Sequence, residues 1–207
     1  MNNNAFHDAP ILVYGPRKGG TTLLQSLLDG GQDVVMLPGE LKLKWLAQRT
    51  QLSPQQFAEY YAQRGRLDFQ FLLQRDERNQ VLKPLRAKPS YHFASFSTEQ
   101  TNQIFDPARY AHSLEELRHQ TFDASTHEAL ASQILTQDVD AFIAALKTPN
   151  PNWKTWGSKE VGGDTRAVLE YWRRVFPQGK IVFLVREPVF VVRSIITDRR
   201  RKNQTMS

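Results

Sequence analysis

Short apolar runs recur along the chain, and each one is followed by a longer segment with helical signals. Runs of four to nine residues that are apolar at most positions and bounded by Gly, Pro or Asn are typical of buried strands. They occur at residues 11–14 (ILVY), 33–37 (DVVML) and 180–188 (KIVFLVREP), and the more polar stretch 155–161 (TWGSKEV) is predicted to be a short strand with a loop. Pro38 and Gly39 are predicted to end the second run.

The helical signals are terminal residues and apolar spacing. Ser53 and Pro54 form an N-cap and a first-turn proline, and Asp164 is placed to cap a later helix. The helices are predicted at residues 21–29 (with Leu23, Leu24, Leu27 and Leu28 on one face), 53–64, 126–147, 164–176 and after Pro188. Residues 76–109 are polar and aromatic without clear periodicity, so they are predicted to be irregular and to lie on the substrate side.

Strands that alternate with helices predict an α/β protein with a central parallel sheet covered by helices on both faces. A chain of 207 residues with 40% hydrophobic residues can bury one substantial core, so we expect a single domain over residues 1–207. Without cysteine, a disulfide framework and a thiolate metal site are excluded. The polar N-terminus and the lack of a long apolar run favour a cytoplasmic protein without a membrane span. The net charge of +6 favours acidic ligands.

The loop after the first run, GPRKGGTTLL, has the composition of an anion-binding loop. In the nucleoside-triphosphate loop, GxxxxGK[ST], lysine follows the last glycine. Here Lys18 precedes Gly19 and Gly20, and the hydroxyls of Thr21 and Thr22 follow the glycines. The free N–H groups of a helix N-terminus attract anions, and glycines allow close approach and positive φ. A terminal phosphate or a sulfuryl group fits such a loop.

The last apolar run ends in a cation rather than a carboxylate. Enzymes with the triphosphate loop commonly place an Asp at this point to help hold magnesium. Here Arg186 comes first, with Glu187 behind it, and Ser194 stands eight positions after Arg186. Together with the loop, this arrangement indicates a ligand with two separated anionic groups that is held without a metal.

On these residues the chain resembles the sulfotransferases that use 3′-phosphoadenosine 5′-phosphosulfate (PAPS). GPRKGGTTLL is similar to the 5′-phosphosulfate loop of heparan sulfate sulfotransferases, and FLVREPVFVVRS is similar to the 3′-phosphate motif. WGSKEV resembles a GxK segment of bacterial and tyrosyl-protein sulfotransferases. The resemblance implies a three-layer fold like that of P-loop NTPases. It also implies PAPS as co-substrate, no metal, and a hydroxyl-bearing acceptor.

The resemblance assigns roles to particular positions. It makes Lys18 the cation on the transferring sulfuryl group. The implied donor-binding residues are Arg17, Lys18, Gly19, Gly20, Thr21 and Thr22 around the 5′ end, and Arg186 and Ser194 around the 3′-phosphate.

Two further catalytic positions follow from the resemblance. Glu40 in LPGELKL matches the catalytic glutamate of heparan sulfate sulfotransferases, with Lys42 where some of those enzymes have histidine. Lys159 matches a lysine that stabilises the leaving bridging oxygen, although Lys88 in KPSYHF competes for this role. His92, in the same stretch, is the alternative base.

Several alternatives remain open at the level of sequence. The chain ends soon after the 3′-phosphate motif, whereas sulfotransferases normally continue, so the usual C-terminal part is expected to be missing and an inactive donor-binding relative is possible. A P-loop nucleotide kinase is the competing enzyme class. A nucleic-acid-binding module is not favoured, because no basic stripe with exposed aromatics lies outside the donor motifs. A glycan is the first choice of acceptor, followed by a tyrosyl peptide or a small metabolite, and the oligomeric state is not indicated.

Overall fold

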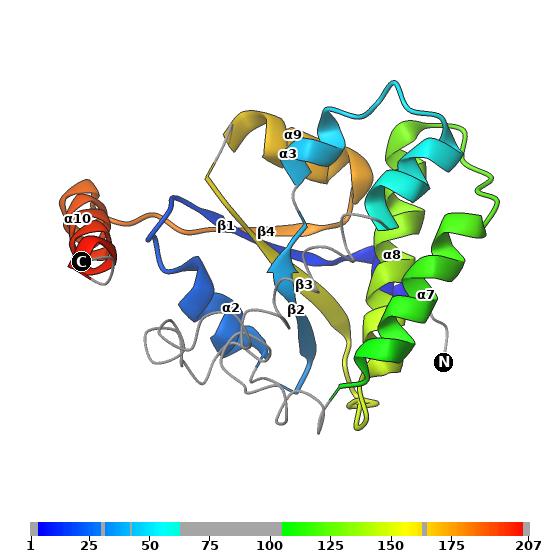
Figure 1. The fold of residues 1–207 in the computed structure, drawn as a ribbon, viewed down its shortest axis with the longest axis horizontal. Helices are drawn as coiled ribbons and strands as arrows, with labels where there is room; N and C mark the ends of the chain where they lie inside the picture. The colour runs from blue at the N-terminus through cyan, green and yellow to red at the C-terminus, as the bar shows by residue number, and fades with distance from the viewer. Residues whose placement is uncertain (1–3, 30–31, 42, 63–104, 163–164, 205–207) are drawn as a thin grey trace.

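The computed structural model describes residues 4–29, 32–41, 43–62, 105–162 and 165–204. Its centre is a parallel sheet with the strand order β2-β3-β1-β4 (Figure 1). The strands are β1 (Ile11–Gly15), β2 (Val34–Glu40), β3 (Thr155–Val161) and β4 (Lys180–Phe183). Every strand pair is parallel, which confirms the predicted α/β class with helices around a parallel sheet.

The helices are α1 (Asn4–Asp8), α2 (Thr21–Asp29), α3 (Leu43–Ala47), a helix over residues 54–62, α7 (Pro107–His119), α8 (His127–Ala145), α9 (Thr165–Val175) and α10 (Pro188–Gln204). Their starts follow the chain's own capping residues. Ser53 and Gln56 exchange side-chain to backbone hydrogen bonds, which is a capping box ahead of Pro54. The Thr126 hydroxyl accepts from the N–H of Ala129 at 3.1 Å and begins α8 as predicted.

Helix α7 was not predicted, because residues up to 109 were assigned to an irregular stretch. Asp106 caps this helix, and its carboxylate accepts from the N–H groups of Ala108 and Arg109 at 3.0 Å each. Pro107 occupies the first turn. Asp followed by Pro is the same N-terminal signal that located the helix after Ser53, so the sequence contained the information. The rest of that stretch, residues 76–104, lies outside the described residues.

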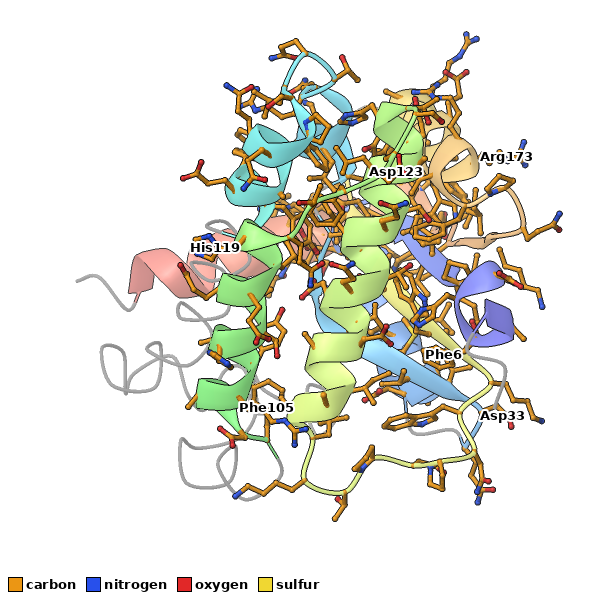
Figure 2. The ribbon with its side chains drawn as sticks, turned by 90° about the vertical axis from the view of Figure 1, so that its right-hand side faces the viewer. Phe6, Asp33, Phe105, His119, Asp123 and Arg173 are labelled. Atoms are coloured by element: carbon orange, nitrogen blue, oxygen red, sulfur yellow. The ribbon has the colours of Figure 1, made fainter. Side chains whose placement is uncertain are left out.

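One face of the sheet carries the main core. Trp156 of β3 is fully buried and meets Trp172 of α9 at a ring-centroid distance of 6.1 Å and Phe176 at 5.5 Å. Helices α3, α8 and α9 and the helix over 54–62 contribute the other buried side chains of this face. Helix α7 packs along α8, and Figure 2 shows side chains filling the space between them, with Phe105 at one end and His119 at the other.

Helix α2 packs on β1, β2 and β3. Because side chains alternate along β3 and Trp156 faces the main core, Gly157 and Lys159 face the opposite side, toward α2. The predicted single apolar face of α2 is wrong in part. Leu23 and Leu27 are 62% and 66% exposed, so the helix presents two large apolar side chains outward.

Two strands differ from their predicted ends. β2 continues through Pro38 and Gly39 to Glu40, with a register shift between Met36 and Glu40, whereas it was expected to stop at Leu37. β4 ends at Phe183, well before Pro188, and pairs with β1 alone among the described strands. Val182 and Phe183 are 38% and 46% exposed, so this edge strand is only partly covered. In the described part of the chain, no helix is long and apolar enough to cross a membrane.

Candidate functional site

All strands run in the same direction, so their carboxyl ends meet at one edge of the sheet. Val13 of β1 is in register with Lys159 of β3 on one side and with Val182 of β4 on the other. Glu40 at the end of β2 is in register with Lys159. We therefore define the candidate site as this edge of the sheet. It brings together the loop after β1, the Glu40 segment, Lys159 and the stretch after β4.

The loop between β1 and α2 has an unusual backbone. Lys18 has a φ of +62° and Gly20 a φ of +99°. Positive φ was expected at both glycines; Gly20 shows it, whereas Lys18, a residue with a Cβ, adopts it in place of Gly19. Gly19 is needed for space instead: its N–H donates to Pro16 O at 2.8 Å, and an added Cβ would lie 2.7 Å from that same oxygen. A lysine held in the left-handed region indicates a loop fixed by its surroundings.

The cations and hydroxyls of the loop are not equally accessible. Arg17 and Lys18 are exposed and Thr22 is half-buried, whereas Thr21 is only 3% exposed. The Thr21 methyl lies beside Gly15, where an added Cβ would approach it to 3.1 Å. Thr21 therefore packs the base of the loop against β1, while Arg17, Lys18 and Thr22 are the side chains nearer to solvent.

Arg186 reaches this loop from the stretch after β4. Its Nη1 donates to the backbone carbonyl of Lys18 at 2.8 Å, and its guanidinium carbon lies 6.0 Å from the centre of the Phe190 ring in α10. The predicted placement of Arg186 and Lys18 at one edge of the sheet agrees with this contact. Ser194 is half-buried on α10, and among the described residues it makes no hydrogen bond with Arg186.

A pocket of about 370 Å³ opens beside the loop, between the ends of β1 and β4 and the start of α9. One wall is aromatic, because Tyr14 and Phe183 stack with ring centroids 5.6 Å apart. The Tyr14 hydroxyl donates to Gly162 O at 3.0 Å, which ties this wall to the end of β3. Arg17 and Arg186 supply cationic lining. Pockets of this size with an apolar wall and a few polar groups are typical of small-molecule sites.

Glu40 and Lys159 form an ion pair, with Lys159 Nζ 3.6 Å from Glu40 Oε1. The Lys159 side chain is 7% exposed and that of Glu40 is 24% exposed. A buried ammonium requires a partner, and here the partner is the carboxylate that sequence resemblance also singled out. Lys159 thus lies inside the sheet and is not a solvated residue at a strand edge.

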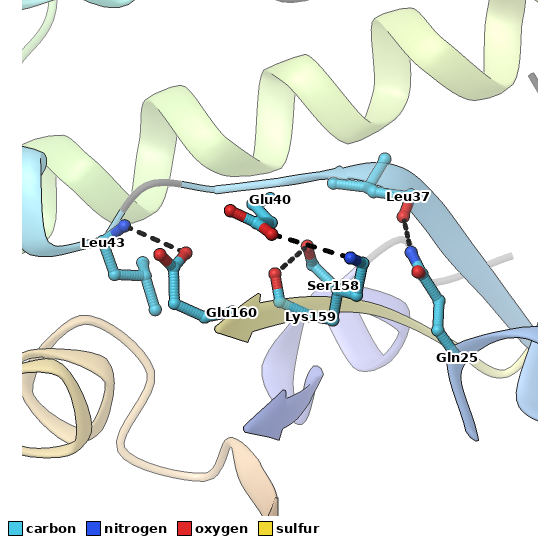
Figure 3. Close-up of polar contacts among 7 residues, drawn as sticks. All are labelled: Gln25, Leu37, Glu40, Leu43, Ser158, Lys159 and Glu160. Carbon is cyan, nitrogen blue, oxygen red and sulfur yellow. Dashed lines mark hydrogen bonds and ion pairs between the residues drawn. The ribbon is translucent and has the colours of Figure 1, made fainter. Parts of the chain in front are cut away.

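Two buried side chains that sequence reasoning missed flank this pair (Figure 3). Gln25 of α2 donates from Nε2 to Leu37 O at 2.5 Å, and Glu160 Oε2 accepts from the N–H of Leu43 at 3.3 Å. They are 4% and 5% exposed. Gln25 interrupts the apolar pattern of α2, which is a sequence signal, whereas Glu160 follows two other polar residues in β3 and has no such signal.

Lys42, Lys88, His92 and Asp164 lie outside the described residues. Among the described residues, no cluster of three or more His, Cys, Asp or Glu side chains forms a metal-binding arrangement.

Comparison with known proteins gave one match. A family model described as a sulfotransferase family matches residues 10–207, which include the loop after β1, Glu40, Lys159 and Arg186. A search of curated proteins and a search of solved structures gave no match.

Proposed function

The chain belongs to the sulfotransferase family, and we propose that it transfers a sulfuryl group from PAPS to a hydroxyl acceptor, with a glycan as the first choice of acceptor. The observation that carries this proposal is the contact of Arg186 with Lys18 at 2.8 Å. It brings the cation after β4 to the loop after β1, as recognition of a ligand with both a 5′ and a 3′ anionic group requires.

The loop suits the 5′ end of such a donor. Its exposed cations Arg17 and Lys18 supply charge, and the loop leads directly into the N-terminus of α2, where the first helical N–H groups attract anions. The neighbouring pocket, with its stacked Tyr14 and Phe183, is suited to the nucleoside, and Arg186 at its rim to the 3′-phosphate. Ser194 is the proposed second contact to that phosphate.

Glu40 is the proposed general base, and it takes the proton of the acceptor hydroxyl as that oxygen forms its bond to sulfur. Lys18 holds the sulfuryl oxygens, while Lys159 stabilises the bridging oxygen that leaves with the nucleotide. The products are a sulfate ester and adenosine 3′,5′-bisphosphate. Sulfuryl transfer of this kind depends on positioned donors around the transferring group, as phosphoryl transfer does.

The test is calorimetric titration with adenosine 3′,5′-bisphosphate, with and without a chelator, followed by turnover assays with PAPS and a panel of glycans, tyrosyl peptides and small phenols. We expect binding that the chelator does not change, and product formation with at least one glycan. Binding that requires magnesium and prefers ATP would instead support a nucleotide kinase and overturn the proposal.

A further inference from the structure

The segment of β2 that carries Glu40 departs from regular pairing with β3. Met36 is in register with Gly157 and Glu40 with Lys159, so four steps along β2 match two steps along β3. Because both intervals are even, Glu40 and Lys159 remain on the same face of the sheet as Met36. An irregular segment has fewer ladder hydrogen bonds, so contacts outside the sheet must help to fix the position of Glu40.

Gln25 makes such a contact from the middle of α2. Its Nε2 donates to the carbonyl oxygen of Leu37, which lies inside the irregular segment and three residues before Glu40. Gln25 and Leu37 are 4% and 6% exposed. Removing the Gln25 donor would leave this carbonyl buried and unpaired, which is costly enough to favour a shift of the segment.

The chain is held separately at the start of this segment and, beyond its end, at the start of α3. The N–H of Met36 donates to Asp29 Oδ1 at 2.9 Å, and the N–H of Leu43 donates to Glu160 Oε2 at 3.3 Å. Gln25 therefore contacts the part between two anchored ends, which is the part that carries Glu40 (Figure 3). It holds the backbone three residues before Glu40, whereas the carboxylate itself is paired with Lys159.

We propose that Gln25 is a positioning residue that holds the β2 segment so that Glu40 lies against Lys159. Gln25 stands on the helix that begins directly after the anion-binding loop, so the same helix aligns the loop and the Glu40 segment. The expected effect on turnover rests on the proposed function, whereas the effect on the Glu40–Lys159 pair does not.

The principal variant is Gln25→Met, which keeps the side-chain length and removes the donor. We expect kcat to fall on the order of 10- to 100-fold, as for a small displacement of a catalytic group. Affinity for adenosine 3′,5′-bisphosphate should stay unchanged. Gln25→Glu, which cannot donate when ionised, is the second variant in case the first is poorly folded, and it should change kcat in the same direction.

A double variant separates positioning from general damage to the fold. If Gln25 acts through Glu40, then Gln25→Met combined with Glu40→Gln should be no slower than Glu40→Gln alone. Multiplied losses in the double variant would overturn the proposal. Gln133→Met is the matched control, because Gln133 also donates to a backbone carbonyl, that of Asp123 at 3.3 Å, on the surface between α7 and α8.

A second readout does not need turnover. The rate at which an amine-reactive ester acylates Lys159, followed by mass spectrometry, should rise in Gln25→Met and stay at the wild-type value in Gln133→Met. An unchanged rate in both Gln25 variants would overturn the proposal. If the wild-type protein lacks sulfotransferase turnover, the proposed function fails, and the acylation rate alone decides the role of Gln25.

Discussion

The guanidinium of Arg186 donates a hydrogen bond to the backbone carbonyl of Lys18 at 2.8 Å, which joins residues 168 positions apart in the sequence. Lys18 has a φ of +62°, which is a strained backbone conformation for a residue with a Cβ. Arg186 therefore contacts the loop at a strained position. The arginine assigned to one end of the proposed donor thus also supports the loop assigned to the other end. Recognition of the two anionic groups is expected to be coupled.

Arg186→Ala should weaken binding of adenosine 3′,5′-bisphosphate by about 1.5–3 kcal/mol, the usual effect of losing a hydrogen bond to a charged group. Adenosine 5′-phosphosulfate, which lacks the 3′-phosphate, should lose less affinity, because for this ligand only the support of the Lys18 carbonyl is removed. Calorimetry on both ligands gives the comparison. Equal losses would show that Arg186 acts through the loop and does not recognise the 3′-phosphate.

Replacing Lys18 separates its charge from its backbone conformation. Lys18→Ala and Lys18→Gly should both weaken donor binding and turnover, because each removes the cation. In urea unfolding, however, Lys18→Gly should be at least as stable as Lys18→Ala, because glycine adopts positive φ without steric cost.

The control for Lys18 is Arg173, an exposed residue within α9. There the order should reverse, with Arg173→Gly less stable than Arg173→Ala by about 1 kcal/mol. The same order at both positions would contradict the left-handed conformation of Lys18.

Glu40→Gln should retain donor binding and reduce turnover by about 10²–10⁴-fold, the range for loss of a general base. Glu170→Gln is a suitable control, since Glu170 forms an exposed pair with Arg166 on α9 at 2.7 Å. If Glu40→Gln turns over like the wild type with a verified acceptor, the base is elsewhere, and His92 is the next candidate.

Asp138 gives a prediction about stability and pH. Burial raises the pKa of its carboxyl, and hydrogen bonds from the hydroxyls of Tyr110 and Tyr61, each at 2.5 Å, oppose the rise. A raised pKa means that the folded state binds the proton more tightly than the unfolded chain. This contribution to stability is complete below the ordinary Asp pKa of about 3.9 and is lost as pH rises through the folded-state pKa.

The free energy of unfolding of the wild type should therefore fall relative to that of Asp138→Asn as pH is raised from about 4 toward neutrality. Urea unfolding across this range measures the difference. Tyr110→Phe removes a hydrogen bond that lowers the pKa, so in that variant the loss should extend to higher pH. Parallel curves for the wild type and Asp138→Asn would contradict the raised pKa.

The sequence was sufficient for the sheet and for the edge where the candidate site lies. Apolar runs located β1 and the start of β4, and parallel strands bring the loop near Lys18 and the stretch near Arg186 to one edge. Capping residues such as Ser53 and Thr126 located helix starts, because an N-cap interaction is local and depends on few residues.

Features that depend on tertiary contacts were not predictable in the same way. The burial of Lys159 depends on β3 lying between β1 and β2, and nothing in its own strand specifies those neighbours. Where β2 continues past Pro38, the neighbouring Leu37 carbonyl accepts a hydrogen bond from Gln25, which comes from α2. Local propensity favours a strand end at proline, and here tertiary contacts override that preference.

Because β4 is an edge strand, the two sides of the proposed site should differ in local stability, with β1 more stable than β4. β1 is hydrogen-bonded on both sides, by β3 and β4, whereas β4 is paired with β1 alone among the described strands. Amide hydrogens of β1 should exchange with solvent only on global unfolding, while those of β4 should exchange through local opening. A ligand that contacts both the loop after β1 and Arg186 after β4 binds only the closed, folded form. By mass action it should slow exchange in β4 and, because it also opposes global unfolding, in β1. The rate of amide hydrogen exchange in β4 would then show whether the donor is bound.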